Sequence, residues 1–227
     1  MKNMFFFLKS LSRSVHDEEH QQQPEISNSR GGAGCSSGAG GDLSTSLTVW
    51  RKSLLVSCTG FTVIDCTGNL VYRVDNYMGG RPKELVLMDG KGTSILTMKR
   101  CKNLGLIDKW VIYGGEVGDY CTSVVSEKPV FYVKKCINIL HTNPNVLAYV
   151  YRRSSDERYA YTIEGSYSHR SCKVVDERKR VVAEMKRKDA MIGGISFGLD
   201  IFMLIIEAGF DPGFAMALVL LLDQMFS

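Results

Sequence analysis

The side chains in this sequence best suited to chemistry are basic residues grouped in pairs and triplets along its second half. They are Lys134, Lys135, Arg152, Arg153, Arg178, Lys179, Arg180, Lys186, Arg187 and Lys188. Residues 128–189 hold 14 lysines and arginines against 7 aspartates and glutamates, whereas residues 191–227 hold four acids and no base. If these groups gather at one place, they would bind the phosphates of phospholipid head groups or of nucleic acid. The plainer interpretation is that they cover solvated strand faces.

Groups that could catalyse a reaction are few. His169 lies near Cys172, but successive residues of a strand alternate faces, so the two side chains should point in opposite directions. The sequence contains no phosphate-loop motif and no zinc-ligand spacing. We therefore expect no catalytic residues, no metal and no cofactor.

Cysteine usage and the N-terminus bear on the compartment. The seven cysteines form no C-x-x-C pair, and no N-x-S/T acceptor occurs, as is typical of a reducing compartment. The apolar run Met4 to Leu8 is too short for a secretory signal. We expect a monomeric cytoplasmic protein without a transmembrane span, with a peripheral membrane or nuclear location as the alternatives.

Residues 1–43 differ in composition from the rest of the chain. They contain a glutamine run, Gln21 to Gln23, and a Gly/Ser/Ala-rich segment, Gly31 to Gly41. Such a segment cannot bury enough apolar surface to offset its ordering entropy, so we expect residues 1–43 to form a disordered low-complexity arm. Residues 44–227 are then one folded domain.

Short runs with strand character fill that domain. They are rich in Val, Ile, Tyr, Phe and Thr, and turn sequences such as D-C-T-G-N separate them. About twelve strands in succession predict an all-β fold, a closed barrel or a sandwich. The predicted strands are 47–54, 61–65, 70–74, 84–88, 94–99, 110–113, 130–136, 146–152, 159–164, 167–175, 181–186 and 200–206.

An internal similarity supports the barrel. Asp89 to Arg100 and Asp176 to Arg187 both fit D-x8-M-K-R. In each copy the aspartate should open a turn, with the methionine of the following strand facing inward and the next lysine facing outward.

The C-terminal run from Phe210 to Phe226 is apolar on every side of a helix, so that helix must be buried. Asp211 suits the N-cap and Pro212 the first helical position, which predicts a helix over about 212–226. Its uncharged stretch is too short to span a membrane. A twelve-stranded barrel is wider than its own side chains can fill, so we expect this helix inside it. Asp223 should then reach solvent at a barrel mouth or pair with a cation.

Several segments resemble the plant LURP-one-related proteins: L-T-V-W-R-K-S-L (47–54), G-F-T-V-I-D-C-T-G-N-L-V-Y-R-V-D-N-Y (60–77), E-L-V-L-M-D-G-K-G (84–92), W-V-I-Y-G-G-E from Trp110, and the segment 200–224. The resemblance covers about residues 45–226. It implies the tubby-like architecture, a twelve-stranded barrel around a central hydrophobic helix, which phospholipid scramblases share. It also implies a link to plant defence and, by analogy across the superfamily, to membrane-tethered transcription regulation.

Three binding hypotheses follow. The first is a non-catalytic membrane-surface or phosphoinositide-binding module that uses the basic residues. The second is a regulator that binds nucleic acid or protein, in which Tyr149, Tyr151, Tyr159 and Tyr161 would stack on bases. The third, a carrier of hydrophobic ligands, conflicts with a lumen filled by a helix. Calcium-dependent lipid scrambling is not expected, because the acids at 200, 207 and 211 are too widely spaced for a calcium loop.

Overall fold

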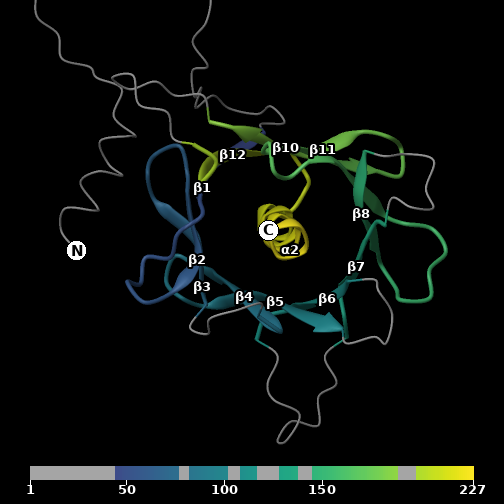
Figure 1. The fold of residues 1–227 in the computed structure, drawn as a ribbon, viewed down its shortest axis with the longest axis horizontal. Helices are drawn as coiled ribbons and strands as arrows, with labels where there is room; N and C mark the ends of the chain where they lie inside the picture. The colour runs from purple at the N-terminus through teal and green to yellow at the C-terminus, as the bar shows by residue number, and fades with distance from the viewer. Residues whose placement is uncertain (1–43, 77–81, 102–107, 117–127, 138–144, 189–197) are drawn as a thin grey trace, which may run out of the picture.

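The computed structural model of the protein is a closed antiparallel barrel of twelve strands with one helix in its centre (Figure 1). The structure describes residues 44–76, 82–101, 108–116, 128–137, 145–188 and 198–227. The arm predicted over residues 1–43 lies outside these described residues. The predicted fold class, a barrel of about twelve strands enclosing a hydrophobic C-terminal helix, is confirmed.

The strands follow one another around the barrel in sequence order, and the last pairs with the first. They are β1 (Thr45–Trp50), β2 (Thr59–Ile64), β3 (Leu70–Asn76), β4 (Glu84–Asp89), β5 (Ser94–Cys101), β6 (Lys109–Gly114), β7 (Phe131–Lys135), β8 (Val146–Tyr151), β9 (Tyr161–Ser166), β10 (Ser171–Asp176), β11 (Val181–Arg187) and β12 (Ile201–Ile206). The helix is α2 (Pro212–Phe226).

Strand direction decides which loops share a mouth of the barrel. Because all neighbouring strands are antiparallel, every odd-numbered strand runs the same way. Arg51, directly after β1, contacts Asp223 in the last turn of α2, so the odd-numbered strands end where the helix ends. We call this the C-terminal mouth. The even-numbered strands end at the opposite, N-terminal mouth, where α2 begins.

The helix begins as its sequence predicts and is buried on all sides. Asp211 has an extended backbone, and its side-chain Oδ1 accepts a 2.6 Å hydrogen bond from the Phe214 N–H, with Pro212 in the first turn. Apolar side chains pointing inward from the strands, such as Leu87 and Ile163, are fully buried in the same core cluster as the helix. The lumen is therefore filled by protein, which argues against a carrier of lipocalin type.

Aromatic rings pack together at the N-terminal mouth. The Phe131 ring stacks on the Phe214 ring with centroids 4.3 Å apart, and the Tyr161 and Phe210 rings meet edge to face at 5.3 Å. The Phe210 and Phe214 rings are 5.6 Å apart. This cluster covers the first turn of α2 with apolar surface.

The two copies of the internal similarity occupy equivalent places. Met98 on β5 and Met185 on β11 are both buried in the core. The Asp176 carboxylate accepts hydrogen bonds from the backbone N–H groups of its turn, and the backbone hydrogen bond from Arg180 is the main cause that lowers the pKa of Asp176. The Asp89 carboxylate has the same role in the β4–β5 turn. The predicted turn aspartates and inward methionines are confirmed.

Two strand boundaries differ from the prediction by four residues, whereas the others lie within two residues of it. The first strand ends at Trp50 rather than residue 54, because the buried Ser53 hydroxyl donates to the Asp75 carboxylate and holds the chain in a loop. The strand predicted from Tyr167 begins at Ser171, since residues 167–170 form a turn closed by a 3.0 Å hydrogen bond from the Arg170 N–H to the Tyr167 carbonyl.

Candidate functional site

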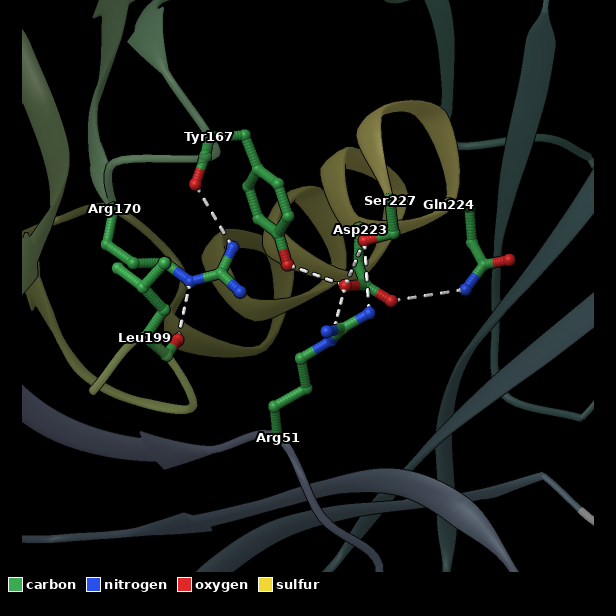
Figure 2. A network of polar contacts seen from close by, with 7 residues as sticks. All are labelled: Arg51, Tyr167, Arg170, Leu199, Asp223, Gln224 and Ser227. Atoms are coloured by element: carbon green, nitrogen blue, oxygen red, sulfur yellow. Dashed lines mark hydrogen bonds and ion pairs between the residues drawn. The ribbon is translucent and has the colours of Figure 1, made fainter. Parts of the chain in front are cut away.

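A buried carboxylate organises the C-terminal mouth (Figure 2). Asp223 lies in the last turn of α2 and is 6% exposed. Its Oδ1 pairs with the Arg51 guanidinium at 2.8 Å and accepts 2.8 Å hydrogen bonds from the Tyr167 and Ser227 hydroxyls. The prediction that Asp223 reaches solvent or pairs with a cation is confirmed by the pairing with Arg51. A negative charge there opposes the helix dipole, so the adjacent guanidinium stabilises this helix end.

A buried arginine extends this network. Arg170 is 5% exposed and has a positive φ of 53°. Its Nε donates to the Leu199 carbonyl at 2.8 Å, and a second guanidinium nitrogen donates to the Tyr167 carbonyl at 3.1 Å. The guanidinium also lies 4.2 Å from the centre of the Tyr167 ring. Arg170 thus ties the β9–β10 turn to the chain leading into β12.

Tyr167 joins the two groups as a neutral donor. Burial is the main cause that raises the pKa of Tyr167 well above its usual range, and the nearby Asp223 carboxylate raises it further. The phenol therefore keeps its proton and donates a hydrogen bond to the Asp223 carboxylate.

Lys135, one of the predicted binding residues, is engaged within the protein. Its ammonium donates to the Met225 carbonyl at the end of α2 and lies 4.4 Å from the centre of the Phe226 ring. A lysine in this position satisfies a helix carbonyl that has no partner within the helix. Lys135 therefore caps the C-terminal end of α2.

The ten predicted basic residues do not gather at one mouth. Lys134, Lys135, Lys186, Arg187 and Lys188 lie at the ends of odd-numbered strands, at the C-terminal mouth. Arg152, Arg153, Arg178, Lys179 and Arg180 follow β8 and β10, at the N-terminal mouth. The sets are at opposite ends because successive strands run in opposite directions, so a single cationic surface of all ten is ruled out.

Acids accompany the basic residues at the N-terminal mouth. Arg152 pairs with Glu177 at 3.1 Å and Arg180 with Asp176 at 2.8 Å. Two adjoining hollows, about 440 and 520 Å³ in volume, share Arg152, Ala160 and Glu177 in their walls. Four arginines and four acids line these hollows together: Arg152, Arg158, Arg178, Arg180, Asp156, Glu157, Asp176 and Glu177. Charges of both signs compensate one another here.

The three cations at the end of β11 differ in their partners. Arg187 is exposed and lies in register with the lumen-facing Phe202, so it lies on the rim. Lys186 pairs with Glu184 at 2.9 Å on the outer wall. The Lys188 ammonium donates to the Thr48 hydroxyl at 3.0 Å, and burial lowers the pKa of Lys188. Within the described residues, Arg187 has no ion-pair partner.

Beside Arg51 lies a polar hollow of about 390 Å³. Its lining includes the exposed Lys52, Asn76 from the end of β3, and Gln224 and Ser227 from the helix end. Sequence reasoning missed this site because its residues come from the β1–β2 loop, β2, the end of β3 and the end of α2, which are separated along the chain. In the described part of the chain, no three His, Cys, Asp or Glu side chains lie close enough together to hold a metal ion.

His169 and Cys172, the pair considered for nucleophilic catalysis, share no hydrogen bond in the described part of the chain. His169 is exposed in the β9–β10 turn and its Nδ1 hydrogen-bonds with the Ser166 hydroxyl at 2.8 Å. Burial is the main cause that raises the pKa of the Cys172 thiol to about 12. The prediction that His169 and Cys172 lie on opposite faces of one strand was wrong, since His169 lies in the β9–β10 turn. His141, the other histidine of the domain predicted over residues 44–227, lies outside the described residues.

The family comparison and the relatives identify one family, and a solved structure has the same fold. Residues 45–223 match the family described as LURP-one-related. The protein LURP-one-related 17 of Arabidopsis thaliana is 50% identical, covering 99% of this chain and 100% of that protein. LURP-one-related 8 of the same plant is 46% identical over 79% of this chain and 86% of its own length. An X-ray structure of another Arabidopsis thaliana protein has the same fold, with a TM-score of 0.55 at 24% identity, over 79% of this chain and 90% of that one.

Proposed function

This chain belongs to the LURP-one-related family, and we propose that it is a non-catalytic module that binds anionic phospholipid head groups at a membrane surface through its C-terminal mouth. The observation that carries this proposal is the set of exposed cations on that rim. Arg187 and Lys52 are exposed there, and neither has an ion-pair partner among the described residues. A part in plant defence, which the family resemblance implies, stays a prediction.

The balance of charge favours the C-terminal mouth over the other end, where four acids lie among four arginines. At the N-terminal mouth Arg152 and Arg180 are paired with acids, so their fields are largely cancelled at a distance. At the C-terminal mouth Arg51 is paired with the buried Asp223, but Lys52 and Arg187 remain. Within the described residues, no helix has both the length and the apolar character needed to cross a membrane.

The proposal predicts that Lys186→Ala/Arg187→Ala/Lys188→Ala weakens binding to phosphatidylcholine vesicles that contain a phosphoinositide. Each cation near an anionic leaflet contributes about 1 kcal/mol, and Lys186 is partly neutralised by Glu184, so we expect a loss of roughly tenfold to a hundredfold. Sedimentation with vesicles over a range of lipid concentrations measures the partition coefficient.

The matched control removes the same charge from the other mouth. Arg178→Ala/Lys179→Ala/Arg180→Ala also replaces three cations, one of them in an ion pair, and should bind as the unaltered protein does. An equal loss for both triple variants would contradict binding through the C-terminal mouth. Failure of the unaltered protein to bind these vesicles would contradict the whole proposal.

A second candidate function, binding of single-stranded nucleic acid, is favoured by the outer wall of β6–β8. Lys134 lies between Lys109 and Tyr149 in the strand register, and its ammonium is 4.4 Å from the centre of the Tyr151 ring. The Tyr149 and Tyr159 rings are 5.3 Å apart on the same wall. Tyrosines interleaved with lysines provide stacking faces and phosphate partners. Tyr161 differs from this prediction, because it packs against the core inside the barrel.

If this wall binds nucleic acid, a labelled single-stranded oligonucleotide should show raised fluorescence anisotropy with the protein at low salt. Tyr151→Ala should weaken binding by about 1–3 kcal/mol through lost stacking. Lys134→Ala should make the dependence of log K on log salt shallower by about one phosphate contact. Arg178→Ala, away from this wall, is the control. Unchanged anisotropy at low salt would remove this candidate.

A further inference from the structure

The loop between β1 and β2 ends in an apolar tip at the C-terminal mouth. Its sequence over residues 51–58 is R-K-S-L-L-V-S-C, which contains two cations and no acid. Val56 is 97% exposed and Leu55 is 37% exposed, and both are among the few large apolar side chains left in solvent within the described residues. A scattered apolar side chain on a surface is ordinary, but adjacent exposed apolar residues beside cations are typical of an interaction site.

The base of this loop is held firmly by the barrel. The Thr62 hydroxyl donates to the Lys52 carbonyl at 2.7 Å, and the Arg51 N–H donates to the Asp200 carbonyl at 2.8 Å. The Ser53 hydroxyl, buried, accepts a 3.0 Å hydrogen bond from the Leu55 N–H while it donates to Asp75. The tip is therefore presented on a fixed support.

Turn chemistry does not account for the residues at the tip. The Cys58 N–H donates to the Leu55 carbonyl at 3.2 Å, which closes a four-residue turn with Val56 at its second position. Turns favour Gly, Pro, Asn, Asp and Ser, whereas a branched apolar residue in solvent contributes nothing to the turn. Neither packing nor turn formation explains Val56, so its apolar surface fits contact with a partner.

Charge identifies the partner. Arg51 and Lys52 lie directly before the tip, and Arg187 lies on the same mouth. Leu199, at the same mouth, is a further exposed apolar side chain. An apolar tip flanked by cations matches the boundary between acyl chains and anionic head groups, where apolar side chains enter the acyl region and Lys or Arg stays at the head groups.

We propose that Leu55 and Val56 insert into the interfacial region of an anionic bilayer while Lys52 and Arg187 remain at the level of the head groups. This inference rests on the proposed membrane-surface function and adds the anchor that holds the barrel there. It assigns the loop 51–58 a role distinct from charge attraction, because the tip contributes through burial of apolar surface, which salt does not screen.

The test uses the full chain with phosphatidylcholine vesicles that contain a phosphoinositide. Val56→Asp should lower the partition coefficient about tenfold, since it removes an apolar contact and brings a negative charge to an anionic surface. Val181→Asp changes a valine at the N-terminal mouth that is 39% exposed, and it should bind as the unaltered protein does. Thermal unfolding of Val56→Asp should match that of the unaltered protein, because Val56 is 97% exposed.

Insertion itself is measured with Val56→Trp. With the signal of Trp50 and Trp110 subtracted, emission from residue 56 should shift to the blue on vesicle binding and be quenched by brominated acyl chains, whereas Val181→Trp should show neither effect. If the unaltered protein does not bind these vesicles, the proposed function fails and insertion fails with it. If it binds, but Val56→Asp binds equally and Val56→Trp is not quenched, insertion alone is overturned. A blue shift that grows with protein concentration in the absence of vesicles would mean that the tip binds a second copy of the chain. That result would also overturn insertion.

Discussion

Leu221→Asp should leave the protein unable to form its barrel. Leu221 is 0% exposed in the middle of α2, with inward-facing side chains of the strands around it. The change loses about 2 kcal/mol of apolar burial and places a carboxyl group where no cation or water can reach it, at a cost of several kcal/mol more. Since a domain is stable by only about 5–15 kcal/mol, most of that stability would be lost. We expect the variant in the insoluble fraction, without a cooperative unfolding transition in urea.

Leu221→Met is the matched control for this result. It keeps the volume and the apolar character of the side chain, so it should lower the free energy of unfolding by less than about 1.5 kcal/mol. Val56→Asp adds the same charge in solvent and should leave stability unchanged. A soluble Leu221→Asp protein with a normal urea transition would mean that α2 is not part of the folded core.

Asp223→Ala should lower the free energy of unfolding by about 2–4 kcal/mol. The change leaves the Tyr167 hydroxyl buried without its acceptor and deprives Arg51 of its carboxylate. We place the value below that of a fully buried pair because the Arg51 side chain is 37% exposed and solvent screens it. Urea unfolding followed by circular dichroism measures the change.

A double-mutant cycle with Tyr167→Phe measures how strongly the Asp223 and Tyr167 side chains depend on each other for stability. We expect a coupling energy of about 0.5–3 kcal/mol between Asp223→Ala and Tyr167→Phe, because both remove the same hydrogen bond. Glu177→Ala is the comparison for an exposed ion pair, since the Glu177–Arg152 pair lies mostly in solvent and should contribute at most about 1 kcal/mol. Equal losses for Asp223→Ala and Glu177→Ala would contradict an organising role for the buried carboxylate.

Local patterns were enough to predict the architecture. Strand runs, turn aspartates such as Asp89 and Asp176, and the apolar C-terminal helix are all signals between neighbours in sequence. The prediction failed where a contact between distant segments decides the structure. Ser53 leaves the strand because Asp75 on β3 accepts its hydrogen bond, and this bond cannot be inferred from the sequence around residue 53.

The candidate site was harder to predict for the same reason. Arg51, Tyr167 and Asp223 come from a strand end, a turn and a helix, and each is unremarkable in its own segment. The division of the basic residues between two mouths could have been predicted from the order of the strands. Lys134 and Lys135 end the seventh predicted strand and Arg152 ends the eighth, and consecutive antiparallel strands end on opposite sides.

Closure of the barrel by β1 and β12 has a consequence for how the chain folds. Thr45 pairs with Ile206, so the seam joins the first strand to the last, and α2 follows every strand in sequence. While the chain is being synthesised, the inward faces of the strands emerge before the helix that covers them exists. Contacts between such distant residues form slowly and leave apolar surface uncovered meanwhile. We therefore expect this protein to depend on chaperones during synthesis more than a helical bundle of equal length does.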